Sequence, residues 1–104
     1  MPKRVYLATR NLLFRSKLAG AVTEAGGEVT HDAAACDLAV VEIEAAGPMP
    51  EIRAAVERGV PVLAFGSHVA AATLRAAREA GAVAVPNSQI EERLRAMLTS
   101  PRAE

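Results

Sequence analysis

The sequence predicts one α/β domain over residues 1–104, in which five parallel strands form a doubly wound sheet in the order 2-1-3-4-5. Three observations support this prediction. Short apolar runs, typical of buried parallel strands, alternate along the chain with segments of helical periodicity. The chain is long enough for a hydrophobic core and contains no internal repeat or linker. Only 3% of its residues are aromatic while 51% are hydrophobic, so the core must consist mainly of small aliphatic side chains.

The first strand and the first helix are the clearest elements of the sequence. Val5–Ala8 is a short apolar run, and Asn11 is placed to cap the helix that follows it. The helix has one apolar face, which is formed by Phe14, Leu18, Ala21, Val22 and Ala25. Gly26 and Gly27 then end the helix, because glycine is favoured just beyond a helix C-terminus.

The connection between the second and third strands is unusually short. We expect strands at Glu28–His31 and at Leu38–Val41, which leaves only residues 32–37 between them. A parallel crossover normally needs a dozen residues or more. The second helix of the doubly wound arrangement is therefore expected to be shortened to one turn or absent.

The second half of the chain is expected to alternate three helices with two strands. Their expected ranges are 45–59, 60–66, 67–81, 82–86 and 88–98. Ser88 and Glu91 have the spacing of a capping box, which predicts Ser88 as the N-cap of the last helix. Residues 99–104 are expected to form a flexible tail.

Composition excludes several classes of function. The formal net charge is zero, which disfavours general electrostatic binding to nucleic acid. No apolar stretch has the length of a membrane span and no signal peptide is evident, so we expect a cytoplasmic protein. Cys36 is the single cysteine, which rules out an internal disulfide and fits a reducing compartment. Together with His31 and His68 it lacks metal-site spacing, so no metal is expected.

Charge is distributed unevenly along the chain. Residues 1–20 contain five basic residues and no acidic residue: Lys3, Arg4, Arg10, Arg15 and Lys17. Residues 24–51 contain only acidic charges: Glu24, Glu28, Asp32, Asp37, Glu42, Glu44 and Glu51. This asymmetry either steers a partner or reflects a solvated surface with local ion pairs.

Four segments of the sequence resemble the strands of a response-regulator receiver domain, which has a flavodoxin-like fold. They are "RVYLATRN", "DLAVVEI", "VPVLAFGS" and "AGAVAVPNS". The resemblance covers nearly the whole chain. It implies that the first strand should end in two acidic residues, the third in a phosphoacceptor aspartate, the fourth in Thr or Ser, and the fifth in a lysine.

Each functional position of the resemblance is altered in this sequence. The acidic pair falls on Thr9 and Arg10, the phosphoacceptor on Glu42, the Thr or Ser position on Gly66, and the lysine on Ser88. Magnesium prefers carboxylate ligands, and Arg10 would repel it. Glu42 reaches one methylene further than aspartate, so its carboxylate is misplaced for in-line attack. The sequence therefore predicts a pseudo-receiver that is not phosphorylated.

Arg10 and Glu42 are expected at the carboxyl ends of adjacent strands. A guanidinium there could hold the carboxylate in a fork and replace the metal cluster. The alternative is that both side chains point into water.

A second group of residues surrounds the same crevice. Ser67 and His68 open a helix whose backbone N–H groups would favour an anion. The possible anion-binding residues are Thr9, Arg10, Ser67, His68 and Asn87. Alternatively, Ser67 is an ordinary N-cap and His68 faces solvent. No glycine-rich phosphate loop follows the first strand, so no nucleotide or flavin cofactor is expected.

Two classes of function follow. The favoured one is a non-enzymatic signalling module that acts through protein contacts, and the alternative is a sensor of a small anion. An enzyme is the least favoured class, because no catalytic arrangement can be assembled from the sequence.

The missing second helix also predicts an interaction surface. It should leave an apolar patch over the first and third strands, only partly hidden by a shifted third helix and by Ala33, Ala34 and Ala35. A protein partner or a second copy of the chain is expected to dock there. The alternative is a homodimer through the fourth and fifth helices, as the resemblance implies.

Overall fold

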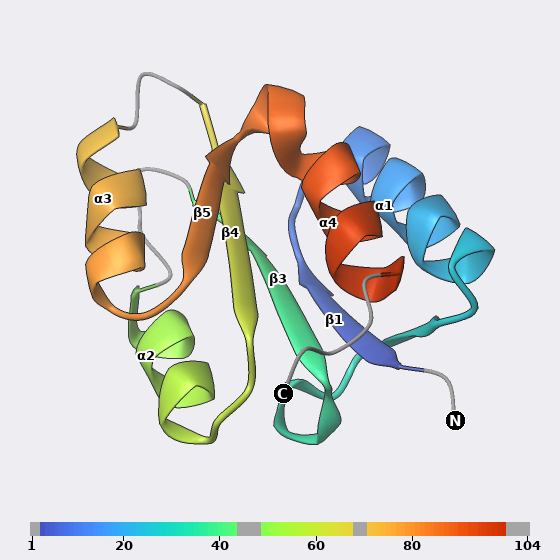
Figure 1. Ribbon diagram of the computed structural model, residues 1–104, viewed down its shortest axis with the longest axis horizontal. Coiled ribbons are helices and arrows are strands. Elements are labelled where there is room, and N and C mark those ends of the chain that lie inside the picture. The colour runs from blue at the N-terminus through green and yellow to red at the C-terminus, as the bar shows by residue number, and fades with distance from the viewer. Residues whose placement is uncertain (1–2, 44–48, 68–70, 100–104) are drawn as a thin grey trace.

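The computed structural model describes residues 3–43, 49–67 and 71–99 (Figure 1). Five parallel strands form one sheet in the order β2-β1-β3-β4-β5, which confirms the predicted fold class. The strands are β1 (Arg4–Ala8), β2 (Glu28–Thr30), β3 (Leu38–Glu42), β4 (Val62–Gly66) and β5 (Val83–Pro86). Because all the strands are parallel, their carboxyl ends meet at one edge of the sheet.

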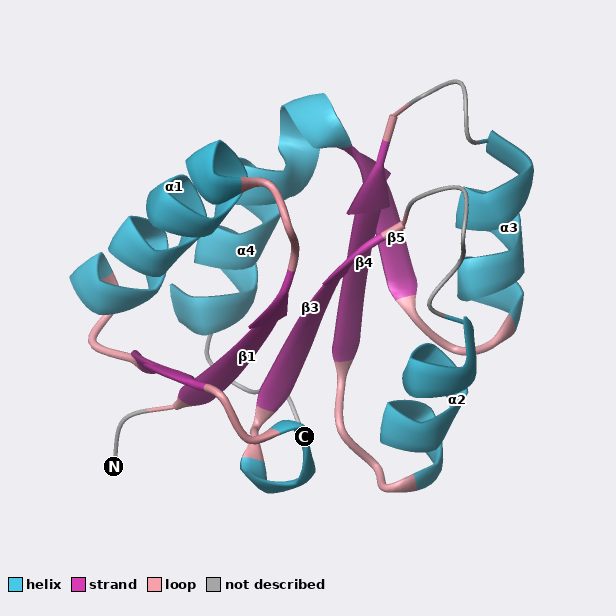
Figure 2. Ribbon diagram, turned by 180° about the vertical axis from the view of Figure 1, so that it is seen from behind, coloured by secondary structure: helices cyan, strands magenta, loops and turns pink. Residues whose placement is uncertain are grey.

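Helices cover both faces of the sheet (Figures 1 and 2). α1 (Leu12–Glu24) and α4 (Ile90–Thr99) lie side by side on one face, and α2 (Met49–Glu57) and α3 (Ala71–Glu79) lie on the other. The core under α1 and α4 contains large side chains such as Leu18, Leu63 and Phe65. The core under α2 and α3 is built largely from alanine and valine, so the helices there can lie close to the sheet.

The ends of α1 form as the sequence predicts. The Asn11 side-chain oxygen accepts hydrogen bonds from the backbone N–H groups of Leu13 and Phe14, at 3.0 and 3.2 Å. These bonds satisfy two of the donors that a helix N-terminus leaves free. At the other end, Gly26 takes a φ of 85°, a left-handed conformation that glycine adopts without a steric penalty.

The start of the last helix differs from the expected capping box. Asn87–Gln89 forms a short 3₁₀ helix, η3, and α4 begins only at Ile90. Ser88 is exposed within η3 and does not cap the helix. Glu91 instead pairs with Arg95, one turn further along α4, at 3.0 Å. The prediction of Ser88 as an N-cap was wrong because the chain makes one 3₁₀ turn before the α-helix begins.

A single 3₁₀ turn, η1 (Ala33–Ala35), replaces the second helix of the doubly wound arrangement. The Asp32 carboxylate caps this turn by accepting a hydrogen bond from the Ala34 N–H, at 2.9 Å. This confirms the predicted shortening. Thr99 is still part of α4, so the expected tail starts no earlier than residue 100, and residues 100–104 lie outside those described.

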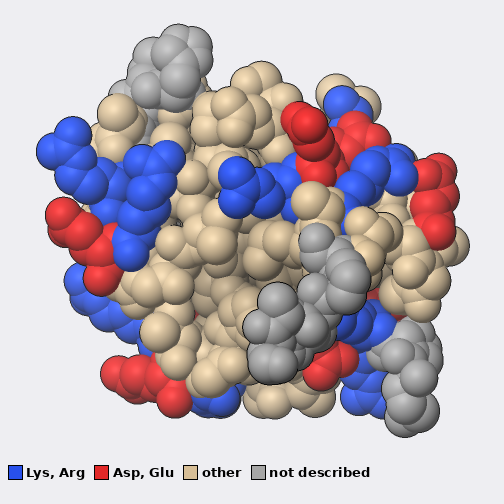
Figure 3. All heavy atoms as spheres, in the orientation of Figure 1, with Lys and Arg blue, Asp and Glu red and all other residues tan. Residues whose placement is uncertain are grey.

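The surface exposes few large apolar side chains. In the described part of the chain these are Leu12, Leu13 and Val83, with 78%, 74% and 37% of their surface exposed. Figure 3 shows the face that carries β5, where charged side chains gather towards both sides and the middle is largely uncharged. Within the same residues, no helix is both long enough and apolar enough to span a lipid bilayer.

Candidate functional site

The predicted site residues lie at the edge of the sheet where the strands end. The register places Ala8 beside Val41, Glu42 beside Phe65, and Gly66 beside Pro86. Residues that follow these strands, including Thr9, Ser67 and Asn87, therefore surround a common edge. His68 lies outside the described residues, so its predicted contribution to an anion site stays a prediction.

Thr9 is the partner of Glu42. The Thr9 hydroxyl donates a hydrogen bond to the Glu42 carboxylate, and both side chains are half-buried. The same hydroxyl accepts a hydrogen bond from the Asn11 N–H, at 3.1 Å. A hydroxyl has one proton to donate and can accept as well, so Thr9 uses both capacities here. It thus ties the end of β3 to the turn that leads into α1.

The expected fork between Arg10 and Glu42 is not formed. Arg10 is exposed, and in the described part of the chain it takes part in no ion pair. Successive side chains of extended chain point to opposite sides. Since Thr9 turns towards Glu42, the following residue turns to solvent, and the guanidinium is left in water.

We expect the replacement of Thr9 by valine to lower the free energy of unfolding by about 1 to 2 kcal/mol, because it leaves a half-buried carboxylate without its donor. Combining Thr9→Val with Glu42→Gln should cost less than the sum of the two single changes. Urea unfolding of the four proteins measures this coupling. Arg10→Ala is the control and should change stability by no more than about 0.5 kcal/mol. An equal loss in the control, or strict additivity, would contradict the assignment.

The end of β4 is closed by the main chain that leaves β3. The Ile43 N–H donates to the Phe65 carbonyl oxygen at 2.6 Å, which draws the two strands together. A Cβ atom added to Gly66 would lie 2.9 Å from the Ile43 carbonyl oxygen. Real Cβ atoms almost never approach an oxygen so closely, so the backbone leaves no room for a side chain here. Glycine at this position is therefore a steric requirement of the edge.

Asn87 carries an unsatisfied polar atom at the end of β5. Its side-chain oxygen is buried, and within the described residues it has no hydrogen-bond partner. The neighbouring Ser88 is exposed in η3. Its side chain is a hydroxyl, so it cannot supply the ammonium group that a lysine would have at this position. No cluster of three acidic, histidine or cysteine side chains suited to a metal ion occurs among residues 3–43, 49–67 and 71–99.

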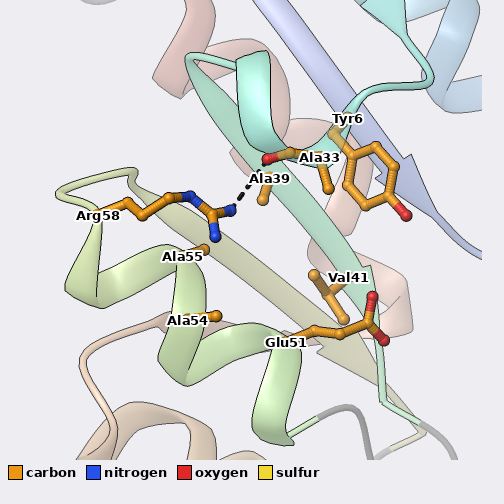
Figure 4. Close-up of a pocket in the computed structure, with 8 residues that line it drawn as sticks. All are labelled: Tyr6, Ala33, Ala39, Val41, Glu51, Ala54, Ala55 and Arg58. Carbon is orange, nitrogen blue, oxygen red and sulfur yellow. Dashed lines mark hydrogen bonds between the residues drawn. The ribbon is translucent and has the colours of Figure 1, made fainter.

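The replacement of the second helix by η1 leaves a pocket on the opposite face from α1. Its volume is about 110 Å³, and it lies between η1 and α2 above β1 and β3 (Figure 4). The lining residues are Tyr6, Ala33, Ala39, Val41, Glu51, Ala54, Ala55 and Arg58. Ala39 and Val41 are buried, with 4% and 3% exposed, so the broad apolar patch expected from the sequence is reduced to this pocket.

η1 forms one wall of the pocket, and two hydrogen bonds hold it in position. Arg58, in the turn that follows α2, donates a hydrogen bond to the Ala33 carbonyl oxygen at 3.0 Å (Figure 4). The Cys36 thiol donates to the same oxygen at 3.4 Å. Burial raises the pKa of this thiol, so it stays protonated at neutral pH and acts as a weak donor. Cys36 is thus a free, buried cysteine.

Sequence reasoning missed two features of these surfaces. It did not find the exposure of Leu12 and Leu13, although the helical spacing that turns Phe14 and Leu18 inward implies it. It also missed the roles of Arg58 and Glu51 at the pocket, because their placement depends on where α2 lies on the sheet.

A five-stranded parallel sheet in this order, covered by helices on both faces, defines the flavodoxin-like class of α/β folds. The chain has the fold of a response-regulator receiver domain, as three solved structures show. The receiver domain of NtrX from Brucella abortus matches with a TM-score of 0.73 at 16% identity, over 95% of this chain and 99% of that one. The orphan response regulator HP1043 of H. pylori gives 0.71 at 18% identity, over 92% and 96%. A response regulator from Burkholderia multivorans gives 0.68 at 22% identity and covers both chains fully, at 100%.

Some similar chains are much longer. In a longer NtrX structure from Brucella abortus the match covers 94% of this chain but only 28% of that one, with a TM-score of 0.71. No protein-family model and no curated protein matches the sequence. The likeness therefore establishes the fold.

Proposed function

We propose that this chain is a non-enzymatic, receiver-like signalling module that acts through protein contacts and does not depend on phosphorylation. The observation that carries the proposal is the bond between Thr9 and Glu42. At the position where the resemblance implies a free phosphoacceptor, the carboxylate is held by a hydroxyl from the neighbouring turn.

The surrounding edge supports the same proposal. Magnesium takes oxygen ligands, mainly carboxylates, and the metal positions of the resemblance are occupied by Thr9 and Arg10. Gly66 has no side chain and no room for one. Ser88 cannot supply the positive charge that stabilises a transferring phosphoryl group. A phosphoryl group at Glu42 would thus lack the metal, hydroxyl and ammonium partners that phosphoryl transfer needs.

Incubation with acetyl phosphate and magnesium, followed by intact mass measurement, tests the proposal. We expect no phosphoryl adduct under conditions in which a phosphorylatable receiver domain, used as the positive control, is modified. Acyl phosphates hydrolyse, so the masses are recorded within minutes of mixing. A stoichiometric adduct that disappears in the Glu42→Gln variant would overturn the proposal.

A second candidate is a sensor of a small anion. It is favoured by the exposed Arg10, whose charge is not used in an ion pair among the described residues. The amide of Asn87 could add an N–H donor, because its oxygen and nitrogen can exchange places by a rotation of the side chain. Titration with inorganic phosphate and sulfate, followed by thermal unfolding, tests this candidate. A rise in melting temperature that is lost in Arg10→Ala would support it, and no rise would count against it.

A further inference from the structure

The pocket between η1 and α2 has the size of one aliphatic side chain. An apolar cavity of about 150 Å³ takes up the six carbons of benzene. By that scale the volume of about 110 Å³ suits the four side-chain carbons of leucine. Its floor and walls are mostly methyl groups, from Ala33, Ala39, Val41, Ala54 and Ala55. Glu51 and Arg58 lie at opposite ends of the pocket (Figure 4).

The chain itself exposes side chains of this kind. Leu12 and Leu13, here named the leucine pair, have 78% and 74% of their surface exposed at the first turn of α1. The Asn11 cap bonds the backbone N–H groups of Leu13 and Phe14, so the turn is held in place. A rigid apolar projection loses little conformational entropy when it is buried, which favours its use as an anchor.

The charges also match at the end of the pocket where Glu51 lies, away from Arg58 (Figure 4). Arg10 is exposed and lies two residues before Leu12, while Glu51 is exposed and lines the pocket. In the described part of the chain neither takes part in an ion pair. Two residues span at most about 7 Å of extended chain. If Leu12 enters the pocket of another copy, the long side chain of Arg10 can therefore reach Glu51.

We propose that Leu12, from the leucine pair of one copy of this chain, occupies the pocket of a second copy, with Arg10 of the first facing Glu51 of the second. This inference rests on the proposed function, because it names the protein contact through which the module acts. The leucine pair belongs to α1, and the pocket lies on the opposite face of the sheet from α1, so we take the interface to be of the heterologous type. One proposal thus accounts for the exposed leucines, the pocket and the exposed charges of Arg10 and Glu51.

Sedimentation velocity over a range of protein concentrations is the first test. We expect concentration-dependent association of the wild type that weakens at high salt, because an exposed ion pair is screened. The double variant Leu12→Glu/Leu13→Glu should weaken association at least tenfold. Both changes lie at an exposed helix N-terminus, where acidic residues are tolerated well, so folding should be preserved.

Filling the pocket from within should have the same effect as removing the leucine pair. Ala54→Leu keeps a good helix former on α2 and places a leucine side chain at the half-buried position that lines the pocket. We expect it to raise the melting temperature and to weaken association at least tenfold. If its far-ultraviolet circular dichroism departs from that of the wild type, Ala54→Glu serves as the second pocket variant.

A mixing experiment distinguishes this interface from all symmetric ones. The leucine-pair variant still has an open pocket, and the pocket variant still has its leucines. Each should associate at least tenfold more weakly on its own than the wild type, yet an equimolar mixture should form a heterodimer. The charge reversals Arg10→Glu and Glu51→Arg should each weaken association, and the doubly reversed chain should recover it.

Val83→Glu is the matched control. It removes the third exposed apolar side chain, which lies on β5 and outside the pocket, and should leave association unchanged. The inference is overturned if the wild type stays monomeric up to about millimolar concentration, if the two variants fail to combine, or if Val83→Glu alone abolishes association. None of these results affects the phosphodonor test, so failure here is distinguishable from failure of the proposed function.

Discussion

Replacing Phe65 with alanine is expected to lower the free energy of unfolding by about 3 to 5 kcal/mol, the usual cost of emptying a large aromatic site in a core. Phe65 is fully buried on β4, between its neighbours β3 and β5. Its ring meets that of Phe14 edge to face, with centroids 5.3 Å apart and an angle of 61° between the planes. This contact fastens the first turn of α1 to the sheet.

The loss is measured by urea unfolding with the wild-type protein alongside. Phe65→Leu is the matched variant and should lose clearly less, because it leaves a smaller cavity. Phe14→Ala should also lose less, since Phe14 is only half-buried. The double alanine variant should show a coupling of about 0.5 to 1.5 kcal/mol, as aromatic pairs do. A loss below about 1 kcal/mol for Phe65→Ala would show that the core under α1 is not packed as described.

The fold could be predicted from the sequence because its signals are periodic and agree with each other. Leu18, Ala21 and Val22 are buried as the helical spacing requires. In β3 the residues from Leu38 to Val41 are all buried, as expected of a strand covered on both faces. The seven residues between β2 and β3, residues 31–37, allowed only one turn, and η1 is that turn.

The details of the site could not be predicted in the same way. Strand register brings residue 9 or residue 10 to the end of β3, and which one faces Glu42 depends on a turn with no periodic signal. Thr9 takes that place because it also accepts a hydrogen bond from the Asn11 N–H, which fixes the turn. The 3₁₀ turn at Asn87–Gln89 moved Ser88 away from its predicted capping role for a similar local reason.

How completely α2 and η1 cover β1 and β3 depends on side-chain packing, which cannot be predicted from the sequence pattern. Apolar strands predicted a gap where the second helix is missing, and the gap is present. Its size is set by α2, whose alanines at 54 and 55 allow close approach to the sheet. Small side chains thus turn an expected patch into a pocket for a single side chain.

Replacing Gly66 with threonine, the residue type that the receiver resemblance implies there, is expected to lower the free energy of unfolding by about 1 to 3 kcal/mol, as overpacking does in a close-packed interior. The reason is the 2.9 Å approach of an added Cβ atom to the Ile43 carbonyl oxygen. The Ile43 carbonyl is part of the backbone, so it cannot rotate away from the added atom as a flexible side chain could. We therefore expect β3 and β4 to separate at this edge.

Three variants isolate the cause. Gly66→Ala adds only the Cβ atom and should account for most of the loss seen with threonine. Gly20→Ala is the control, because Gly20 lies in α1 with nothing within 4 Å of an added Cβ. There alanine should raise stability by about 0.4 to 1 kcal/mol, through its better helix propensity and the reduced freedom of the unfolded chain.

The outcome decides whether the backbone or the side chains close this edge. If Gly66→Thr is as costly as expected, a hydroxyl cannot be introduced at the end of β4 without moving the chain at Ile43, whatever stands at positions 9, 10, 42 and 88. The backbone then leaves no room for a side chain at the end of β4, and the hydrogen bond between Thr9 and Glu42 is a second, separate feature of this edge. If Gly66→Thr unfolds at the same urea concentration as the wild type, the Ile43 carbonyl gives way easily. In that case the altered side chains alone would have to account for the loss of phosphoryl transfer that we propose.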